Sequence, residues 1–153
     1  MKKKLFVWTV VAASLTIGLA GVAFADDHQD RCSVETLQGR YVFSASGFTI
    51  AAGAGLAQPK AIVEIIDFNG DGTLSVPVAT RSVNGVIGRS LPSVGGYTVT
   101  EDCAGTVNFD GPAFDIFIAP RGNQLWLIQT NPSNVFQGSA TRTSRELPDR
   151  NPR

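Results

Sequence analysis

The sequence predicts an all-β protein: an antiparallel, mostly up-and-down barrel of about eight strands, preceded by a signal peptide. Short runs of aromatic and β-branched residues alternate with turn signals spaced roughly 8 to 12 residues apart. Residues 94–130 hold several such runs with almost no spacer, and beyond the first 25 residues only one turn has helical character. The tight connections favour a meander, and barrel closure removes exposed sheet edges. A β-sandwich is the alternative.

The N-terminal segment has the order of a secretory signal peptide. A lysine cluster at 2–4 precedes an apolar run that ends near Val22, and Ala23-Phe24-Ala25 has the small-x-small pattern of a cleavage site. We therefore expect cleavage after residue 25 and a secreted or periplasmic protein. An uncleaved membrane anchor is the alternative, because the apolar run is near the lower length limit of a spanning helix.

The remainder of the chain predicts one domain and a tail. We assign 26–142 to the barrel domain and 143–153, which is charged and contains two prolines, to a flexible tail. Without its leader the chain has 10 basic and 13 acidic residues, a formal net charge of −3. The basic residues are scattered, so nucleic acid is not an expected partner. We expect no stable membrane span after cleavage, and an oligomer is compatible with the sequence.

The elements follow from turn and strand signals. We expect one helical turn with Ser33 as its N-cap and Gly39 at its end. Asn69-Gly70-Asp71-Gly72 predicts a tight turn, and Pro77 suits an edge or bulge position. The expected strands, in chain order, are 40–48, 60–68, 73–84, 85–92, 94–103, 104–109, 113–120, 124–130 and 135–142.

The two cysteines, Cys32 and Cys103, both lie beyond the leader, in a part of the chain that we expect to meet an oxidising compartment. They allow one pairing, which would close a loop of about 70 residues and act structurally. Two free thiols are the alternative.

A series of motifs covers nearly the whole chain beyond the leader: Cys32-Ser33-x-x-Thr36-Leu37-x-Gly39-x-Tyr41-x-Phe43, Phe68 with the Gly-Asp-Gly turn, Asn84-Gly85, Gly96-Tyr97-Thr98-Val99, Asp102-Cys103-x-Gly105-Thr106, Asp115-x-x-Ile118, Thr130-x-Pro132 and Gly138-x-Ala140-x-Arg142. This series resembles small exported bacterial proteins related to the allene oxide cyclase barrel. The resemblance implies an eight-stranded calycin-like barrel with a ligand-sized lumen. It carries no catalytic signature, because its motifs are turn, disulfide and packing residues and the polar catalytic set of the cyclase-like enzymes has no match here.

One carboxylate has the position of a functional group. Glu64 shares a strand face with Ile62, Ile66 and Phe68, so an inward orientation would place it in an apolar lumen, where desolvation disfavours its charged form. It could then serve as an acid–base group or orient a ligand. Alternatively this face points outward, or Glu64 pairs with Arg81 or Arg142. The candidate ligand-binding residues are Tyr41, Phe43, Ile62, Ile66, Phe68, Tyr97, Phe117 and Arg142.

Other chemistries have little support. Asp67, Asn69 and Asp71 match the first half of a calcium loop, but Val78 stands where the bidentate acid is needed, so we favour a plain turn and keep a weak calcium site as the alternative. His28 is the only histidine, which excludes His-based triads and His-rich metal sites. No metal or cofactor is expected.

Three functional hypotheses remain. The first is an exported barrel that binds a small apolar molecule in its lumen without catalysis. The second is a cyclase or isomerase that acts in the lumen, with Glu64 as the acid–base group. The third is a filled barrel that acts as a structural or interaction module through its outer face.

Overall fold

The computed structural model describes residues 31–50 and 55–147, so the predicted signal peptide and the last six residues of the tail lie outside the described residues. This part of the chain contains two 3-10 turns and nine strands, in the order η1 (Val34–Leu37), β1 (Gly39–Ile50), β2 (Ala57–Phe68), β3 (Thr73–Val83), β4 (Val86–Ser90), β5 (Ser93–Val99), β6 (Ala104–Phe109), β7 (Ala113–Ile118), η2 (Pro120–Gly122), β8 (Gln124–Gln129) and β9 (Asn134–Ser144).

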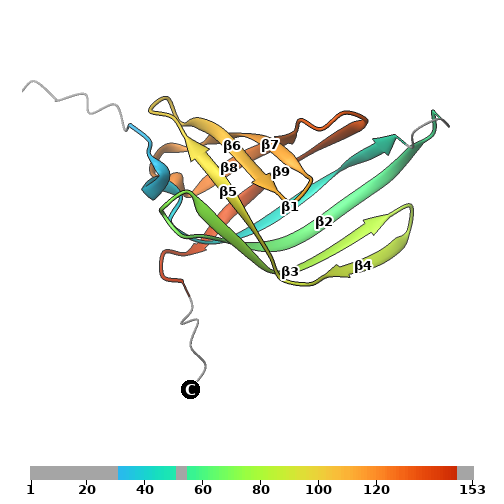
Figure 1. Cartoon of the computed structure of the whole chain (residues 1–153), viewed down its shortest axis with the longest axis horizontal. Helices are drawn as coiled ribbons and strands as arrows, with labels where there is room; N and C mark the ends of the chain where they lie inside the picture. The colour runs from blue at the N-terminus through green and yellow to red at the C-terminus, as the bar shows by residue number, and fades with distance from the viewer. Residues whose placement is uncertain (1–30, 51–54, 148–153) are drawn as a thin grey trace, which may run out of the picture.

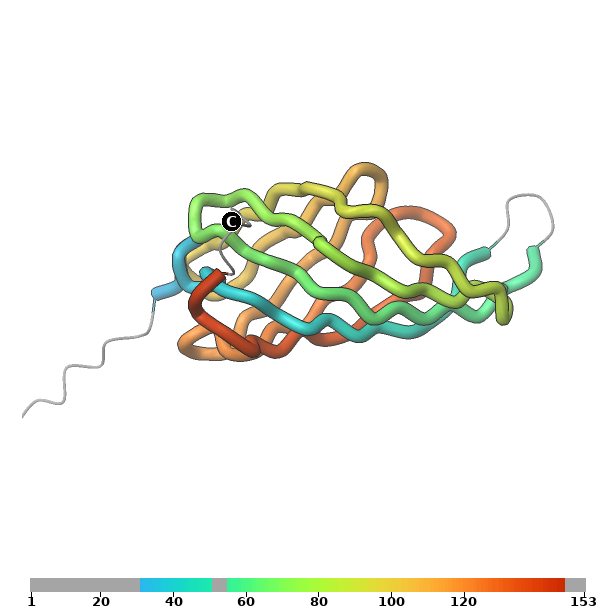
Figure 2. The backbone as a smooth tube through the Cα atoms, turned by 90° about the horizontal axis from the view of Figure 1, so that it is seen from below, coloured from blue at the N-terminus to red at the C-terminus, as the bar shows by residue number. Residues whose placement is uncertain are grey.

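Eight of these strands form a closed antiparallel barrel, which confirms the predicted fold class (Figure 1). Neighbouring strands pair in the order β1, β2, β3, β5, β6, β7, β8 and β9, and β9 returns to β1. The remaining strand, β4, pairs with β3 and lies outside the closed ring. Figure 2 shows β1, β2 and the β3–β4 hairpin extending past the rest of the barrel. A single closed sheet excludes the sandwich.

The local signals agree with the observed elements. The predicted helical turn is η1, and the Ser33 backbone N–H donates to the Thr36 hydroxyl at 2.9 Å. The β2–β3 register shifts between Ile65 and Asp67, opposite Pro77, so this proline lies at the expected bulge. Strand β9 continues to Ser144, two residues beyond the predicted end of the barrel domain.

The disulfide is formed as predicted. Cys32 and Cys103 are bonded, with their Cα atoms 4.9 Å apart and a sequence separation of 71. The bond joins the segment that leads into η1 to the turn between β5 and β6, and the Cys32 N–H also donates to the Glu101 carbonyl at 3.2 Å. It therefore fixes the segment that covers one end of the barrel.

Large side chains fill the end of the barrel that η1 covers. Leu37 of η1 is fully buried there, beside the edge-to-face pairs that Phe68 forms with Tyr41 at 5.1 Å and with Tyr97 at 4.9 Å between ring centroids. The Tyr97 hydroxyl donates to the Val34 carbonyl at 2.9 Å, which ties η1 to this core. We call this the closed half of the lumen.

We expect removal of the disulfide to destabilise the barrel without changing its fold. On the chain-entropy model, opening a loop of this length lowers the free energy of unfolding by about 4 kcal/mol. Urea unfolding of Cys32→Ser/Cys103→Ser, compared with oxidised wild type and with wild type reduced by dithiothreitol, measures this loss. A loss below about 1 kcal/mol in both reduced forms would contradict the structural role of the bond.

Candidate functional site

The other half of the lumen contains a cavity of about 290 Å³. Its walls come from all the strands except β8 and from the segments that follow β4 and β6. We call it the luminal cavity. Its lining residues are Phe43, Lys60, Ile62, Glu64, Val76, Arg81, Ser90, Leu91, Ser93, Phe109, Asp110, Pro112, Phe114 and Phe136.

Four phenylalanines form most of the apolar wall. Phe114 is at their centre, with its ring centroid 6.2 Å from Phe43, 6.0 Å from Phe109 and 6.5 Å from Phe136. The first two pairs meet edge to face and the third is tilted. These contacts hold the rings in fixed orientations, so the wall is preformed rather than assembled by a ligand.

Glu64 points inward and lies on this cavity, which decides between the inward and outward orientations that the sequence left open. It faces Phe43 on β1 and Ala79 on β3 and is only 9% exposed. Within the described residues it forms no hydrogen bond or ion pair, and neither Arg81 nor Arg142 pairs with it. Since every fully enclosed side-chain oxygen or nitrogen in the described residues has a partner, the unpartnered carboxylate oxygens of Glu64 must open into the cavity.

Burial changes the acidity of this carboxyl. Desolvation raises the pKa of Glu64 from 4.5 to about 7, because the apolar surroundings disfavour the charged form. The two other buried polar side chains of the described residues have partners: Asp67 accepts from Arg40, and Gln129 accepts from Lys60. Glu64 is therefore a buried carboxyl that titrates near neutral pH and faces open space.

The charged side chains at the mouth of the luminal cavity either have partners in the protein or contact solvent. Lys60 Nζ donates to Gln129 Oε1 at 3.0 Å and lies 4.1 Å from the centroid of the Phe136 ring. Burial, assisted by the charge of Arg81, lowers the pKa of Lys60. Arg81 and Asp110 are exposed to solvent at the rim.

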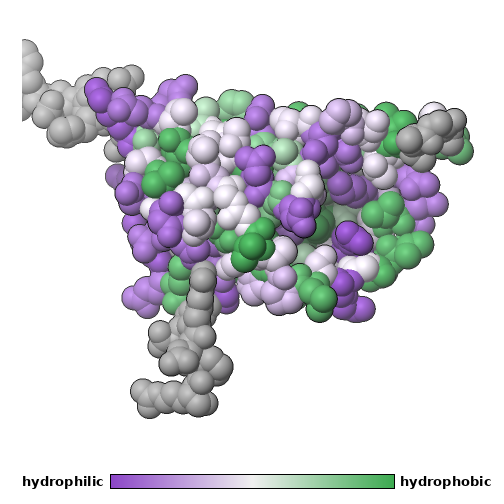
Figure 3. Space-filling model, in the orientation of Figure 1, coloured by the Kyte–Doolittle hydropathy of each residue, from purple (hydrophilic) through white to green (hydrophobic). Residues whose placement is uncertain are grey.

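The rim also carries exposed apolar surface. Val86 and Ile87 of β4 and Leu91 just after it are among the exposed large hydrophobic residues. Figure 3 shows hydrophobic surface gathered at the right of the view, where Figure 1 places the β3–β4 hairpin. Leu91 belongs to the lining of the luminal cavity, so this surface continues into the mouth.

The structure brings together only some of the predicted ligand-binding residues. Phe43 and Ile62 lie on the luminal cavity with Glu64. Ile66 and Phe68 are fully buried further along β2, and Tyr97 is packed beside Phe68 in the closed half. These three residues are core residues rather than cavity lining.

Tyr41 and Arg142 also belong to the closed half and do not line the luminal cavity. Arg142 Nε donates to the Tyr41 hydroxyl at 2.9 Å, and this hydroxyl donates to the Gly122 carbonyl at 2.5 Å. Arg142 Nη2 also donates to the Thr36 carbonyl. The two side chains tie β1 and β9 to η1 and η2, so they hold the closed end together.

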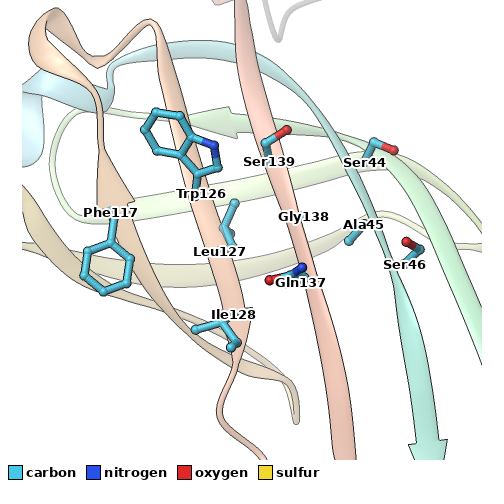
Figure 4. Close-up of a pocket in the computed structure, with 10 residues that line it drawn as sticks. All are labelled: Ser44, Ala45, Ser46, Phe117, Trp126, Leu127, Ile128, Gln137, Gly138 and Ser139. Atoms are coloured by element: carbon cyan, nitrogen blue, oxygen red, sulfur yellow. The ribbon is translucent and has the colours of Figure 1, made fainter.

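Phe117, a predicted ligand-binding residue, lies on the outer wall and not on the luminal cavity. It is 56% exposed, because the alternation of β7 sends Phe114 and Ile116 inward and Phe117 outward. Figure 4 shows it beside Trp126 at a shallow groove of about 550 Å³ that opens on the outside of the barrel. Short side chains such as Ser44 and Ser139 flank the aromatic pair.

The partial calcium motif serves as a turn. Arg40 donates to both carboxylate oxygens of Asp67, at 2.7 and 2.8 Å. Asn69 Nδ2 donates to the Thr73 hydroxyl at 2.7 Å, and Asp71 Oδ1 accepts from the Thr73 N–H at 2.9 Å. The side chains are engaged in the hairpin itself, and the described part of the chain contains no group of three or more His, Cys, Asp or Glu arranged to hold a metal.

Sequence reasoning missed several cavity residues. Phe109, Phe114 and Phe136 come from three strands that meet only after closure, and Lys60 stood out only as the first residue of an expected strand. The available signal was the alternation of each strand, which places Phe114 opposite Phe117 and in phase with Ile116. Alternation predicts the inward face but not the depth along the lumen.

Comparisons with known proteins add no family assignment. No protein-family model matches the chain, and a sequence comparison with curated proteins finds no match. Among the described residues, no helix has the length and apolar character needed to cross a membrane.

The raised pKa of Glu64 makes the free energy of unfolding depend on pH. Between about 4.5 and about 7 the folded state keeps a proton that the unfolded chain releases, so stability falls as the pH rises through this range. We expect Glu64→Gln to match the wild type at pH 4 and to exceed it by about 3 kcal/mol at pH 8.

Urea unfolding at the two pH values measures this difference. Glu146→Gln is the matched control, because Glu146 is exposed, and it should follow the wild type at both. Equal stabilities of Glu64→Gln and wild type at pH 8 would show that the carboxyl is not desolvated.

Proposed function

We propose that the protein binds a small apolar molecule in the luminal cavity, without transforming it. The observation that carries this proposal is the cavity of about 290 Å³, walled by phenylalanines that are fixed by contacts with one another. Ligand sites are typically concave, mostly apolar and preformed, with a few polar groups. Because this cavity is at the small end of the usual range, the ligand should be about the size of a substituted benzene ring.

Export of the protein is part of the proposal. The leader has the sequence order of a signal peptide, and the Cys32–Cys103 disulfide is of the kind that persists in oxidising compartments. The proposed relation to the allene oxide cyclase barrel is supported by the eight-stranded closed ring and its partly hollow lumen. A barrel filled along its whole length, as in the third hypothesis, does not fit this cavity.

An enzyme that acts in the lumen is the second candidate, because Glu64 has the properties of an acid–base group. It is buried, lacks a partner in the described residues and has a pKa of about 7. If the protein is a cyclase or isomerase, Glu64→Gln should abolish turnover of a ligand that co-purifies with it while the affinity stays within about threefold. Unchanged turnover in this variant would remove the candidate.

We expect a larger side chain in the luminal cavity to block ligand binding. Ile62 and Val63 are neighbours on β2, but Ile62 lies on the luminal cavity whereas Val63 is exposed on the outer wall. Isothermal titration calorimetry with 2-phenylethanol, an uncharged probe of the expected size, should show at least about tenfold weaker binding to Ile62→Trp than to wild type, since tryptophan occupies part of the cavity.

Val63→Trp is the matched control and should bind the probe like the wild type. Two results would argue against a luminal site: wild type that does not bind the probe, and loss of binding in both variants. Native mass spectrometry of protein from its own host then identifies any molecule that occupies the cavity.

A further inference from the structure

One charged side chain on the luminal cavity has no partner among the described residues. Of the charged groups on its lining, Lys60 has Gln129 and the Phe136 ring as partners, and Arg81 and Asp110 are exposed to water. Glu64 alone is buried and lacks a partner among the described residues. A buried ionised carboxylate without a partner is costly. A ligand that supplies a cation at this point therefore stabilises the carboxylate and binds more tightly.

The rest of the wall also favours a cation. Aromatic ring faces attract ammonium groups within about 6 Å, and four phenylalanines line the same cavity as Glu64. Lys60 already uses one of these faces, with its ammonium 4.1 Å from the Phe136 centroid. Ammonium groups are therefore stabilised by the same rings that would hold the body of a ligand.

We propose that the ligand of the luminal cavity is a small organic amine, with its ammonium group against the Glu64 carboxylate and its apolar body among the phenylalanines. This inference rests on the proposed function and makes the chemical class of the ligand specific. The amine fills the place of the missing partner, and the aromatic wall covers the pair from water, which strengthens a charge-assisted hydrogen bond.

An anionic ligand is the competing possibility, because Lys60 and Arg81 lie at the mouth. It would bring a second negative charge into the cavity that holds Glu64 and would leave that carboxylate without a partner. Its contacts would be with a solvated guanidinium and an ammonium that already has partners, and exposed pairs of this kind contribute little. The observations therefore favour the amine.

The test uses three probes with the same phenyl body and different head groups: 2-phenylethylamine, 2-phenylethanol and 3-phenylpropanoate. In isothermal titration calorimetry of the oxidised protein at pH 8, we expect the amine to bind at least about tenfold more tightly than the alcohol, and the carboxylate to bind most weakly. In Glu64→Gln the amine should fall to within about twofold of the alcohol, whose affinity stays unchanged. Glu146→Gln is the control and should keep the preference for the amine.

The pH profile tests the ion pair itself. The amine stays protonated up to about pH 10, so below about pH 7 its binding must release the proton of Glu64, and its affinity should fall about tenfold per pH unit. The charged groups on the same cavity are Lys60, Arg81 and Asp110, and the strands beside Glu64 present Phe43 and Ala79 to it. Glu64→Gln removes the carboxyl whose pKa burial raises to about 7, so this variant should lose the pH dependence.

The results of this titration distinguish a failure of the amine preference from a failure of ligand binding in the luminal cavity. Tightest binding of 3-phenylpropanoate, lost in Arg81→Gln, would show that the mouth cations select an anion. Equal binding of the amine and the alcohol would also overturn the inference, and both results would leave the proposed function intact. Failure of all three probes to bind would overturn the inference and the proposed function together.

Discussion

Barrel closure is the constraint on which the rest of this structure depends. Because β2 pairs with both β1 and β3, alternate residues of each strand must enter one common lumen. On β2 this places Ile62, Glu64 and Ile66 in a single inward row. Glu64 cannot turn outward unless the strand shifts by one residue, which would expose its apolar neighbours. Register, rather than attraction to a partner, therefore holds a carboxyl inside an apolar interior.

The lumen then divides into two halves with different roles. In the closed half, η1 covers a core of large aromatic rings, and Arg142 joins Tyr41 to the surrounding backbone. In the other half, which we call the open half, the phenylalanines line the luminal cavity without filling it. The closed half supplies stability and keeps the register, so the open half can tolerate a buried carboxyl and a cavity. Native proteins commonly accept such local costs where they bind ligands.

Much of the fold was predictable because it follows from local signals. Gly- and Asn-rich turns set the strand limits, Pro77 indicated an edge or a bulge, and alternation placed Glu64 on one face with Ile62 and Ile66. The depth of each residue along the lumen depends on long-range pairing, which is why Tyr41 and Arg142 were expected at a ligand. Long-range pairing also decides that β4 pairs only with β3 and lies outside the closed ring, which the local signals could not predict. Phe117 is different, since its outward position was already implied by its alternation with Phe114 and Ile116.

Glu64 is a desolvated carboxyl at an open luminal cavity, and the titration of this carboxyl group measures its desolvation. Carbon-13 NMR of the side-chain carboxyl reports the pKa without reference to a ligand or to unfolding. The structure predicts a pKa of about 7, caused by burial. A midpoint near the ordinary value of 4.5 would mean that water reaches the carboxyl freely, which would contradict a carboxyl held by register in an apolar lumen.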